Sequence, residues 1–290
     1  EQAGKVWLAT LAKVVLENCE LHVCAVDPNG REEQGVITTH FVRPKFWRLK
    51  LVLNLFYPFF SPKDNLIPQA LEIVKKVQPD IIHIHGTEQE WVKLAYELRN
   101  EPVKIVLSIQ GVMSVISRKY TAAYSAWFQY THIYERGGSR GLLLPRTNAH
   151  RYRAAKKAAA IEAAYAPYVH YFTGRTEWDR QIAKVWNPNA VYFQDDRLLK
   201  PAFWNRSWKE VAFDGVWKIY TTSADSVFKG FELIAEAAYL LEKNGLKVQW
   251  TVAGLTKDTP SVRHAEKKLK HRFGRGLRFL GKVGSEQIVD

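Results

Sequence analysis

Cysteine is scarce in this sequence, whose 290 residues include only Cys19 and Cys24. Two cysteines cannot form a disulfide framework or a zinc cluster, so we expect two separate buried thiols in a reducing compartment. Long apolar runs are missing as well. The most apolar stretch, residues 49–60, contains a lysine, an asparagine and a proline, and it is too short to span a bilayer. No signal peptide is visible.

Several catalytic and cofactor-binding motifs are also absent. The sequence has no Walker P-loop, no zinc-ligand spacing and no G-x-S-x-G elbow. No G-x-G-x-x-G follows a predicted strand, which argues against a dinucleotide-dependent dehydrogenase.

Acidic residues are outnumbered, with 29 Asp and Glu against 42 Lys and Arg, which gives a formal net charge of +13. We therefore expect a partner with negative charge, which charge alone leaves open among a nucleotide, a nucleic acid and an anionic membrane. The hydrophobic content of 47% is too high for a largely disordered chain. The chain begins at Glu1, without a methionine, and stops at Asp290 within a helical pattern, so we expect a fragment lacking both ends.

Helical stretches alternate with short apolar stretches along most of the chain. The expected helices are 5–18, 66–77, 88–99, 153–165, 177–185, 231–243 and 261–273, and the expected strands are 21–26, 36–42, 81–85, 103–109, 168–173, 190–193, 216–221, 247–253 and 277–280. Residues 112–149 interrupt this rhythm and should form one or two helices and a loop. The alternation predicts an α/β protein with parallel sheets covered by helices. It restarts after a polar segment near 200–215, so we expect two doubly wound domains, 1–205 and 206–290.

The segment from Ser223 to Gly230 offers the best candidate for a phosphate-binding site. It follows the first strand of the second domain and opens a helix, where backbone N–H groups and the helix dipole attract anions. Lys229 would supply a positive charge, and Gly230 would allow the backbone to approach closely. The alternative, equally supported by the spacing, is that Lys229 is a solvated loop residue.

His85 ends a buried strand, and Gly86 follows it directly. A histidine at that position can polarise a reacting group or donate a hydrogen bond to a sugar hydroxyl. His83, two residues earlier, is better read as a hydrogen-bonded core histidine. Thr87 and Glu88 open the next helix and could line a ligand cleft.

Weaker candidates occupy other ends of predicted strands and helices. Gln110 and Gly111 follow the strand 103–109 and could line the cleft or form a tight turn, and Gly4 could border a ligand at the first helix. Arg175 could meet an anion, or it could pair with Glu177 or Asp179.

Basic and aromatic residues are mixed in 44–50, 56–60 and 112–161. This composition suits docking on an anionic bilayer, with the aromatic rings at the level of the headgroups. The alternative is an ordinary basic surface.

Taken in order, these motifs resemble the bacterial glycosyltransferases of family four, which have the two-domain GT-B fold. The resemblance rests on four elements: residues 4–12, the run Pro79–Gly86, Gly174–Asp179 with Asn187–Asn189, and Lys229–Gly230 with its helix. It implies two Rossmann-like domains facing across a cleft, with the first strand of the N-terminal acceptor-side domain missing and the C-terminal nucleotide-sugar-binding domain partial.

The resemblance also implies a retaining transfer of a sugar from a nucleoside diphosphate sugar to a hydroxyl acceptor, without a metal or cofactor. The acceptor would be a saccharide or a lipid-linked molecule, as in polysaccharide or glycolipid biosynthesis, and the enzyme would be cytoplasmic or peripheral on the inner face of a membrane. Lys229, Gly230, Ser223 and Arg175 would bind the donor phosphates, and His85 would lie near the reacting sugar.

Two departures from the family pattern matter. Many members carry an arginine five residues before the lysine, where this chain has Ala224, so another cation such as Arg175 could contribute. The family's pair of donor-binding glutamates would lie beyond Asp290. We therefore expect this fragment to bind the donor poorly, and it could be inactive on its own. Ala224 supports the alternative of a catalytically silent docking module with the same fold. A nucleic-acid-binding protein is a weaker alternative because no recognisable binding motif is present.

Overall fold

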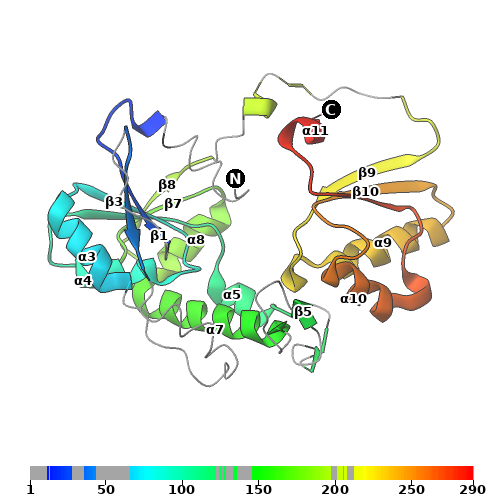
Figure 1. Ribbon diagram of the computed structural model, residues 1–290, viewed down its shortest axis with the longest axis horizontal. Helices are drawn as coiled ribbons and strands as arrows, with labels where there is room; N and C mark the ends of the chain where they lie inside the picture. Colours follow the sequence, from blue (N-terminus) through cyan, green and yellow to red (C-terminus); the bar gives the residue numbers. More distant parts are fainter. Residues whose placement is uncertain are drawn as a thin grey trace. The chain divides into compact units, whose positions relative to one another are not determined.

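The computed structural model describes residues 12, 14–27, 36–43, 66–121, 124–125, 127–128, 133–135, 146–196, 201–204, 206–207 and 212–289. Their helices and strands are labelled in Figure 1. The chain divides into two compact units. The first unit consists of Glu1–Arg118 and Arg153–Leu198, and the second consists of Lys119–Tyr152 and Leu199–Asp290.

The first unit is built on a parallel sheet of four strands in the order β3-β4-β7-β8. These strands are β3 (Ile81–His85), β4 (Lys104–Ser108), β7 (Tyr171–Gly174) and β8 (Val191–Gln194). A separate parallel pair consists of β1 (His22–Val26) and β2 (Thr38–Val42). The described helices of this unit are α3 (Leu66–Val77), α4 (Leu94–Glu97), α5 (Met113–Arg118), α7 (Asn148–Tyr165) and α8 (Glu177–Trp186). The first five residues of α7 are grouped with the second unit. Short 3-10 turns lie at Glu90–Lys93 and Ala166–Tyr168.

Alternate residues of these strands face opposite sides of the sheet. One side forms the core of the unit, where Ile84, Leu107 and Phe172 are at most 4% exposed and pack against helical residues such as Ala183. The burial of these apolar side chains, each worth about 1.5–3 kcal/mol, is the main force that holds the helices on the sheet. The opposite side carries polar side chains of the same strands, described below.

The second unit contains a parallel sheet of three strands in the order β11-β10-β9. They are β9 (Trp217–Thr222), β10 (Val248–Ala253) and β11 (Leu277–Gly281), joined by α9 (Phe231–Lys243) and α10 (Pro260–Leu269). Figure 1 shows α9 and α10 side by side against one face of this sheet. The described part of the unit also includes β5 (Ile133–Glu135), β6 (Arg146–Thr147), α11 (Ser285–Val289) and 3-10 turns at Pro201–Phe203, Val227–Lys229 and Lys270–Arg272.

Residues Lys119–Tyr152 precede α7 in sequence but belong to the second unit. We expected them in the first domain, because they lie between its strands in the chain. Aromatic packing explains the difference. The ring centres of Tyr120 and Phe228 are 5.6 Å apart, and those of Phe128 and His264 are 5.4 Å apart. The second boundary between the units lies between Leu198 and Leu199, close to the domain boundary expected after residue 205.

The α/β class and the parallel sheets predicted from the alternation are confirmed. The expected helices 66–77 and 231–243 match α3 and α9 residue for residue. Helix α7 begins at Asn148, earlier than the expected start at 153. Our expectation of buried thiols was wrong, because both Cys19 and Cys24 are exposed, and neither forms a disulfide.

Candidate functional site

The carboxyl end of β3 meets that of β4 through a tight backbone connection. The N–H of Gly86 donates to the carbonyl of Ser108 over 3.0 Å. Gly86 has a φ of +81°, and a Cβ at this position would overlap the carboxylate of Glu88. The positive φ favours glycine here, whereas the exposed Glu88 side chain can move aside. This geometry lets the chain turn away directly after His85.

A row of polar side chains crosses the non-core side of this sheet. The His83 Nε2 lies 2.6 Å from the Ser108 hydroxyl, which lies 2.7 Å from the Thr173 hydroxyl. The ring centres of His83 and His85 are 4.2 Å apart. Desolvation lowers the pKa of His83, against a weaker opposing effect of the Asp195 carboxylate. His83 is hydrogen-bonded as expected, but it is exposed on the non-core side of the sheet, so its interpretation as a core histidine was wrong.

Thr87, which we expect to line a ligand cleft, is almost fully buried, with 1% of its surface exposed. Its hydroxyl donates to Glu162, a completely buried carboxylate of α7, and also to the carbonyl of Gly111. Glu162 additionally accepts the backbone N–H groups of Met113 and Ser114, at 2.7 and 2.9 Å. The carboxylate therefore joins the turn after β3 to the start of α5, a role that no local sequence pattern indicates.

The remaining candidates of the first unit lie around the same strand ends. Glu88 is exposed, whereas Gln110 and Gly111 are half-buried. Gly111 connects β4 to α5, and its carbonyl is the one that Thr87 contacts.

Arg175 opens the turn from β7 to α8 and has an exposed side chain. Asp179 accepts the backbone N–H groups of Arg175 and Thr176, at 2.9 and 3.1 Å, and Thr176 caps α8 in return. Glu177 pairs with Arg180 rather than with Arg175. Arg175 belongs to the first unit and Lys229 to the second, so these two candidates do not share a unit.

In the second unit, the loop from Ser223 to Gly230 connects β9 to α9, as predicted. A 3-10 turn at Val227–Lys229 leads to Gly230, whose φ of +69° and ψ of +36° are left-handed. This conformation redirects the chain into α9 immediately after Lys229. The Lys229 side chain is exposed, and its ammonium lies 5.2 Å from the centre of the Phe228 ring.

The ends of the three strands in this unit are joined by backbone hydrogen bonds. Ser223 N–H donates to the carbonyl of Ala253 over 2.9 Å, and Gly254 N–H donates to that of Gly281 over 2.6 Å. A Cβ on Gly254 would overlap the carbonyl oxygen of Ser223. The loop that carries Lys229 therefore starts from a tightly packed strand edge.

The start of α7 lies against this loop. Arg151 donates from Nη1 to the carbonyl of Asp225 over 3.1 Å, and the Asp225 carboxylate accepts the backbone N–H of Ser261 over 3.1 Å at the start of α10. The rings of Tyr152 and Tyr120 are 6.0 Å apart. Neither Arg151 nor Asp225 was a candidate from the sequence, since nothing in its pattern brings residues 151 and 225 together.

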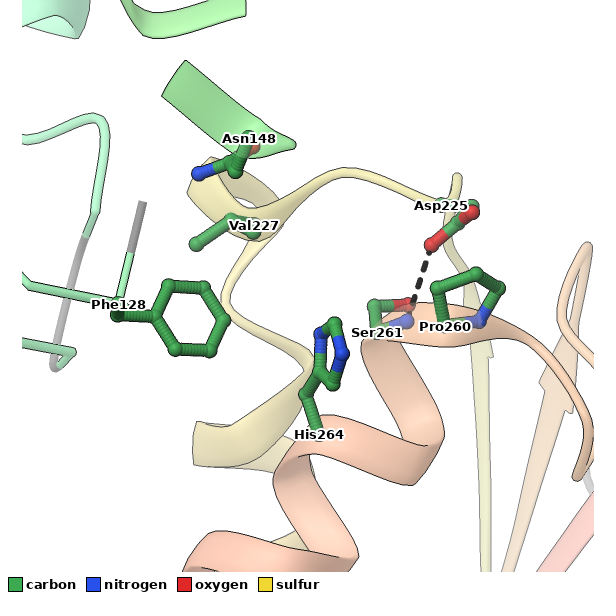
Figure 2. Close-up of a pocket in the computed structure, with 7 residues that line it drawn as sticks. All are labelled: Phe128, Asn148, Asp225, Val227, Pro260, Ser261 and His264. Carbon is green, nitrogen blue, oxygen red and sulfur yellow. Dashed lines mark hydrogen bonds between the residues drawn. The ribbon is translucent and has the colours of Figure 1, made fainter. Parts of the chain in front are cut away.

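A small cavity lies beneath the loop, as Figure 2 shows. Its lining residues are Phe128, Asn148, Asp225, Val227, Pro260, Ser261 and His264. The side-chain amide of Asn148 and the hydroxyl of Ser261 are buried there without a hydrogen-bond partner. Its volume of about 10 Å³ is enough for about one water molecule. We therefore interpret it as a site for one bridging water and not as a site for a sugar.

Among the described residues, no group of three or more His, Cys, Asp or Glu side chains is arranged to hold a metal ion. None of the described helices is both long and apolar enough to cross a membrane. Gly4, the stretches 44–50 and 56–60 and part of the basic region 112–161 lie outside the described residues.

Comparison with known proteins gives weak structural likenesses alone. No family model matches the sequence, and no curated protein matches it. Glycyrrhiza uralensis UGT73P12, solved with glycyrrhetinic acid 3-O-monoglucuronide, is 15% identical with a TM-score of 0.43, over 98% of this chain and 67% of that one. A protein described as a UDP-N-acetylglucosamine 2-epimerase from Listeria monocytogenes is 9% identical with a TM-score of 0.35, over 93% and 71% of the two chains.

S. aureus MnaA, solved with UDP, is 14% identical with a TM-score of 0.32, over 92% of this chain and 70% of that one. At such TM-scores, the likenesses support no conclusion about the activity of this chain. The functional argument below therefore depends on the residues themselves.

Proposed function

We propose that this chain is part of a retaining glycosyltransferase of the GT-B type that takes its sugar from a nucleoside diphosphate sugar. The observation that carries the proposal is the corner between β9 and α9. There, an exposed lysine and a left-handed glycine stand at the start of a 13-residue helix in a parallel β-α-β unit. Such corners at the carboxyl ends of parallel strands are where open α/β sheets bind their ligands.

In this proposal, Lys229 binds the diphosphate of the donor. Its ammonium would stabilise the negative charge that develops on the departing nucleoside diphosphate, which is an electrostatic form of catalysis. The N-terminus of α9 would add the positive end of its dipole. Gly230 allows both groups to face the same phosphate, because the left-handed turn places the helix start next to Lys229.

The first unit would receive the acceptor. His85 ends β3 at a glycine turn, and a histidine there can exchange a proton or a hydrogen bond with a sugar hydroxyl. The acceptor would be a saccharide or a lipid-linked molecule, as in the synthesis of a polysaccharide or glycolipid. The enzyme would be cytoplasmic, and the net charge of +13 is compatible with docking on the anionic inner face of a membrane.

A second candidate function is a catalytically silent module of the same fold that only docks onto a membrane or a partner. Ala224 favours this candidate, because it stands where many family-four enzymes carry a phosphate-binding arginine.

The two candidates are distinguished by donor turnover. The full-length protein would be incubated with UDP-glucose, UDP-N-acetylglucosamine and GDP-mannose, and release of the nucleoside diphosphate would be measured. We expect release from at least one donor, and a loss of at least tenfold in Lys229→Ala. Lys218→Ala is the matched control, because Lys218 is exposed in the same unit and pairs with Asp214. No release from any donor would favour the silent module.

A further inference from the structure

Basic side chains gather on α10 and on the turn that follows it, in the second unit. Residues 260–276 include six lysines and arginines but one acidic residue, Glu266. All six basic side chains are exposed. They are Arg263, Lys267, Lys268, Lys270, Arg272 and Arg275. A surface with this excess of one charge attracts a partner of the opposite charge.

The fold neutralises only part of this charge. Arg272 pairs with Glu236 of α9 over 2.6 Å, and the backbone N–H of Arg275 donates to the Glu242 carboxylate over 3.0 Å. Three of the other side chains form no ion pair with any described residue, Glu266 of the same helix included. These three are Arg263, Lys267 and Lys270.

The three side chains lie along one side of the helix. Arg263 and Lys267 are four residues apart, and Lys270 follows after three more, so they form a stripe. Val262 and Leu269 are at most 2% exposed and belong to the core of the unit. The stripe therefore faces away from the core, and its charges are available to a partner.

The backbone of Lys270 gives a separate indication. Lys270 ends α10 with a φ of +52° and a ψ of −116°, a conformation that a side chain makes unfavourable. Glycine is the residue that usually ends a helix in a left-handed conformation. Because a glycine would form this turn with less strain, the turn does not explain a lysine here, and we attribute its presence to its charged side chain.

An exposed tryptophan borders the same helix. The Lys268 ammonium lies 4.5 Å from the centre of the Tyr124 ring, and the ring centres of Phe128 and His264 are 5.4 Å apart, so residues 124–128 lie against α10. Trp127 has 71% of its surface exposed within this segment. Tryptophan rings favour the headgroup level of a bilayer, where an apolar ring and a polar N–H can both be accommodated.

We propose that the α10 stripe and Trp127 dock this chain on an anionic lipid bilayer. The lysines and the arginine would lie among the anionic headgroups, and the indole of Trp127 would enter the interface beside them. A nucleic acid would also attract the stripe, but the sequence has no recognisable nucleic-acid-binding motif, and the exposed tryptophan favours the bilayer. The inference rests on the membrane docking included in the proposed function and assigns a surface to it.

The test is cosedimentation of the protein with vesicles of phosphatidylcholine alone and of equal parts phosphatidylcholine and phosphatidylserine. We expect binding to the mixed vesicles alone. The double variant Lys267→Ala with Lys270→Gly should bind them about 25-fold more weakly, from about fivefold for each lysine near an anionic surface. Trp127→Ala should weaken the binding that persists at high salt, where the charges are screened.

A matched control removes the same number of basic side chains from the other face of the sheet. Lys218 and Arg278 are exposed, and their register partners on β10, Gln249 and Thr251, are two positions apart and so share a face. The residue between those partners, Trp250, packs in the core with α10. The double variant Lys218→Ala with Arg278→Ala should therefore bind mixed vesicles as the unchanged protein does.

Lys270→Gly alone separates lost binding from lost folding. It relieves the backbone strain at the end of α10, so its thermal unfolding temperature should be unchanged or higher while its binding to mixed vesicles is about fivefold weaker. A loss of binding in this variant then reflects the charge and not the fold.

Three results would overturn the inference: no binding to mixed vesicles, equal losses in the two double variants, or tighter binding of a DNA duplex than of vesicles through the same lysines. Release of nucleoside diphosphate without vesicles should be the same in the Lys267→Ala, Lys270→Gly variant as in the unchanged protein. A failure of docking would therefore leave that release intact, and a failure of donor turnover would leave the vesicle result standing.

Discussion

Thr87 and Glu162 are joined by a buried hydrogen bond between residues that are 75 positions apart in the sequence. The same carboxylate accepts two backbone N–H groups at the start of α5. A glutamine has one acceptor oxygen where the carboxylate has two, so Glu162→Gln would leave a buried donor without a partner. We expect it to lower the free energy of unfolding by about 1–3 kcal/mol, measured by urea denaturation.

The control for this variant is Glu177→Gln. Glu177 lies on α8 in the same unit and forms an exposed pair with Arg180. Its loss should change the unfolding free energy by less than about 0.5 kcal/mol, as is usual for a surface substitution. Equal effects of the two substitutions would show that Glu162 does not hold the turn after β3.

Gly254 gives a second prediction about stability. Its φ of +93° and its contact with the Ser223 carbonyl both exclude a side chain. Gly254→Ala should therefore destabilise the second unit by more than about 2 kcal/mol. Gly245→Ala is a matched control, because Gly245 has a φ of +81° but open space around its Cβ position, so only backbone strain of about 1 kcal/mol is expected. Thermal unfolding of the two variants checks the difference.

His85 and His83 provide a matched pair for testing catalysis. They lie on the same side of β3, but only His85 is at the end of the strand, where a substrate could approach. If the proposed function holds, His85→Asn should lower kcat by at least about 100-fold, the lower range for a lost proton-transfer group. His83→Asn should lower kcat by less than about tenfold. A larger loss of kcat in His83→Asn than in His85→Asn would instead assign the reactive role to His83.

The low pKa of His83 predicts a pH dependence of stability. Desolvation lowers the pKa of the ring in the folded state, so the unfolded chain binds a proton more readily than the folded chain as the pH falls below 6.5. The contribution of this group is intact above its ordinary pKa of 6.5 and is lost as the pH falls through that value and then through the lowered one. His83→Asn should therefore flatten the dependence of unfolding free energy on pH between pH 7.5 and 5.5, measured by urea denaturation.

Much of the fold follows from local sequence patterns. The isoleucine-rich run at 81–85 and the glycine after it predict both β3 and the turn that follows, because β-branched residues and a left-handed turn have direct signatures in sequence. The expected burial of this strand was wrong, because Ile81 and His83 are exposed. Lys229 and Gly230 are equally local, since the corner that contains them lies between a strand and a helix that each have a clear pattern.

The parts that could not be predicted depend on tertiary contacts. Glu162 lies in an alanine-rich helix of mixed polarity, and no local pattern shows that its carboxylate is buried. Lys119–Tyr152 joins the second unit through aromatic packing with residues such as Phe228 and His264, which lie more than 100 positions beyond their partners Tyr120 and Phe128. The contact between Arg151 and Asp225 could not be predicted for the same reason, because Arg151 is one basic residue among many in a region with little regularity.

The central claim is that the corner at Lys229 binds a nucleoside diphosphate. Its most direct test is titration calorimetry of UDP, and of GDP in parallel, into the unchanged chain and into Lys229→Ala, with Lys218→Ala as the control. The account predicts measurable binding of at least one nucleotide, about 10- to 100-fold weaker in Lys229→Ala and unchanged in Lys218→Ala. Equal affinity in all three proteins, or no binding by the unchanged chain, would contradict it.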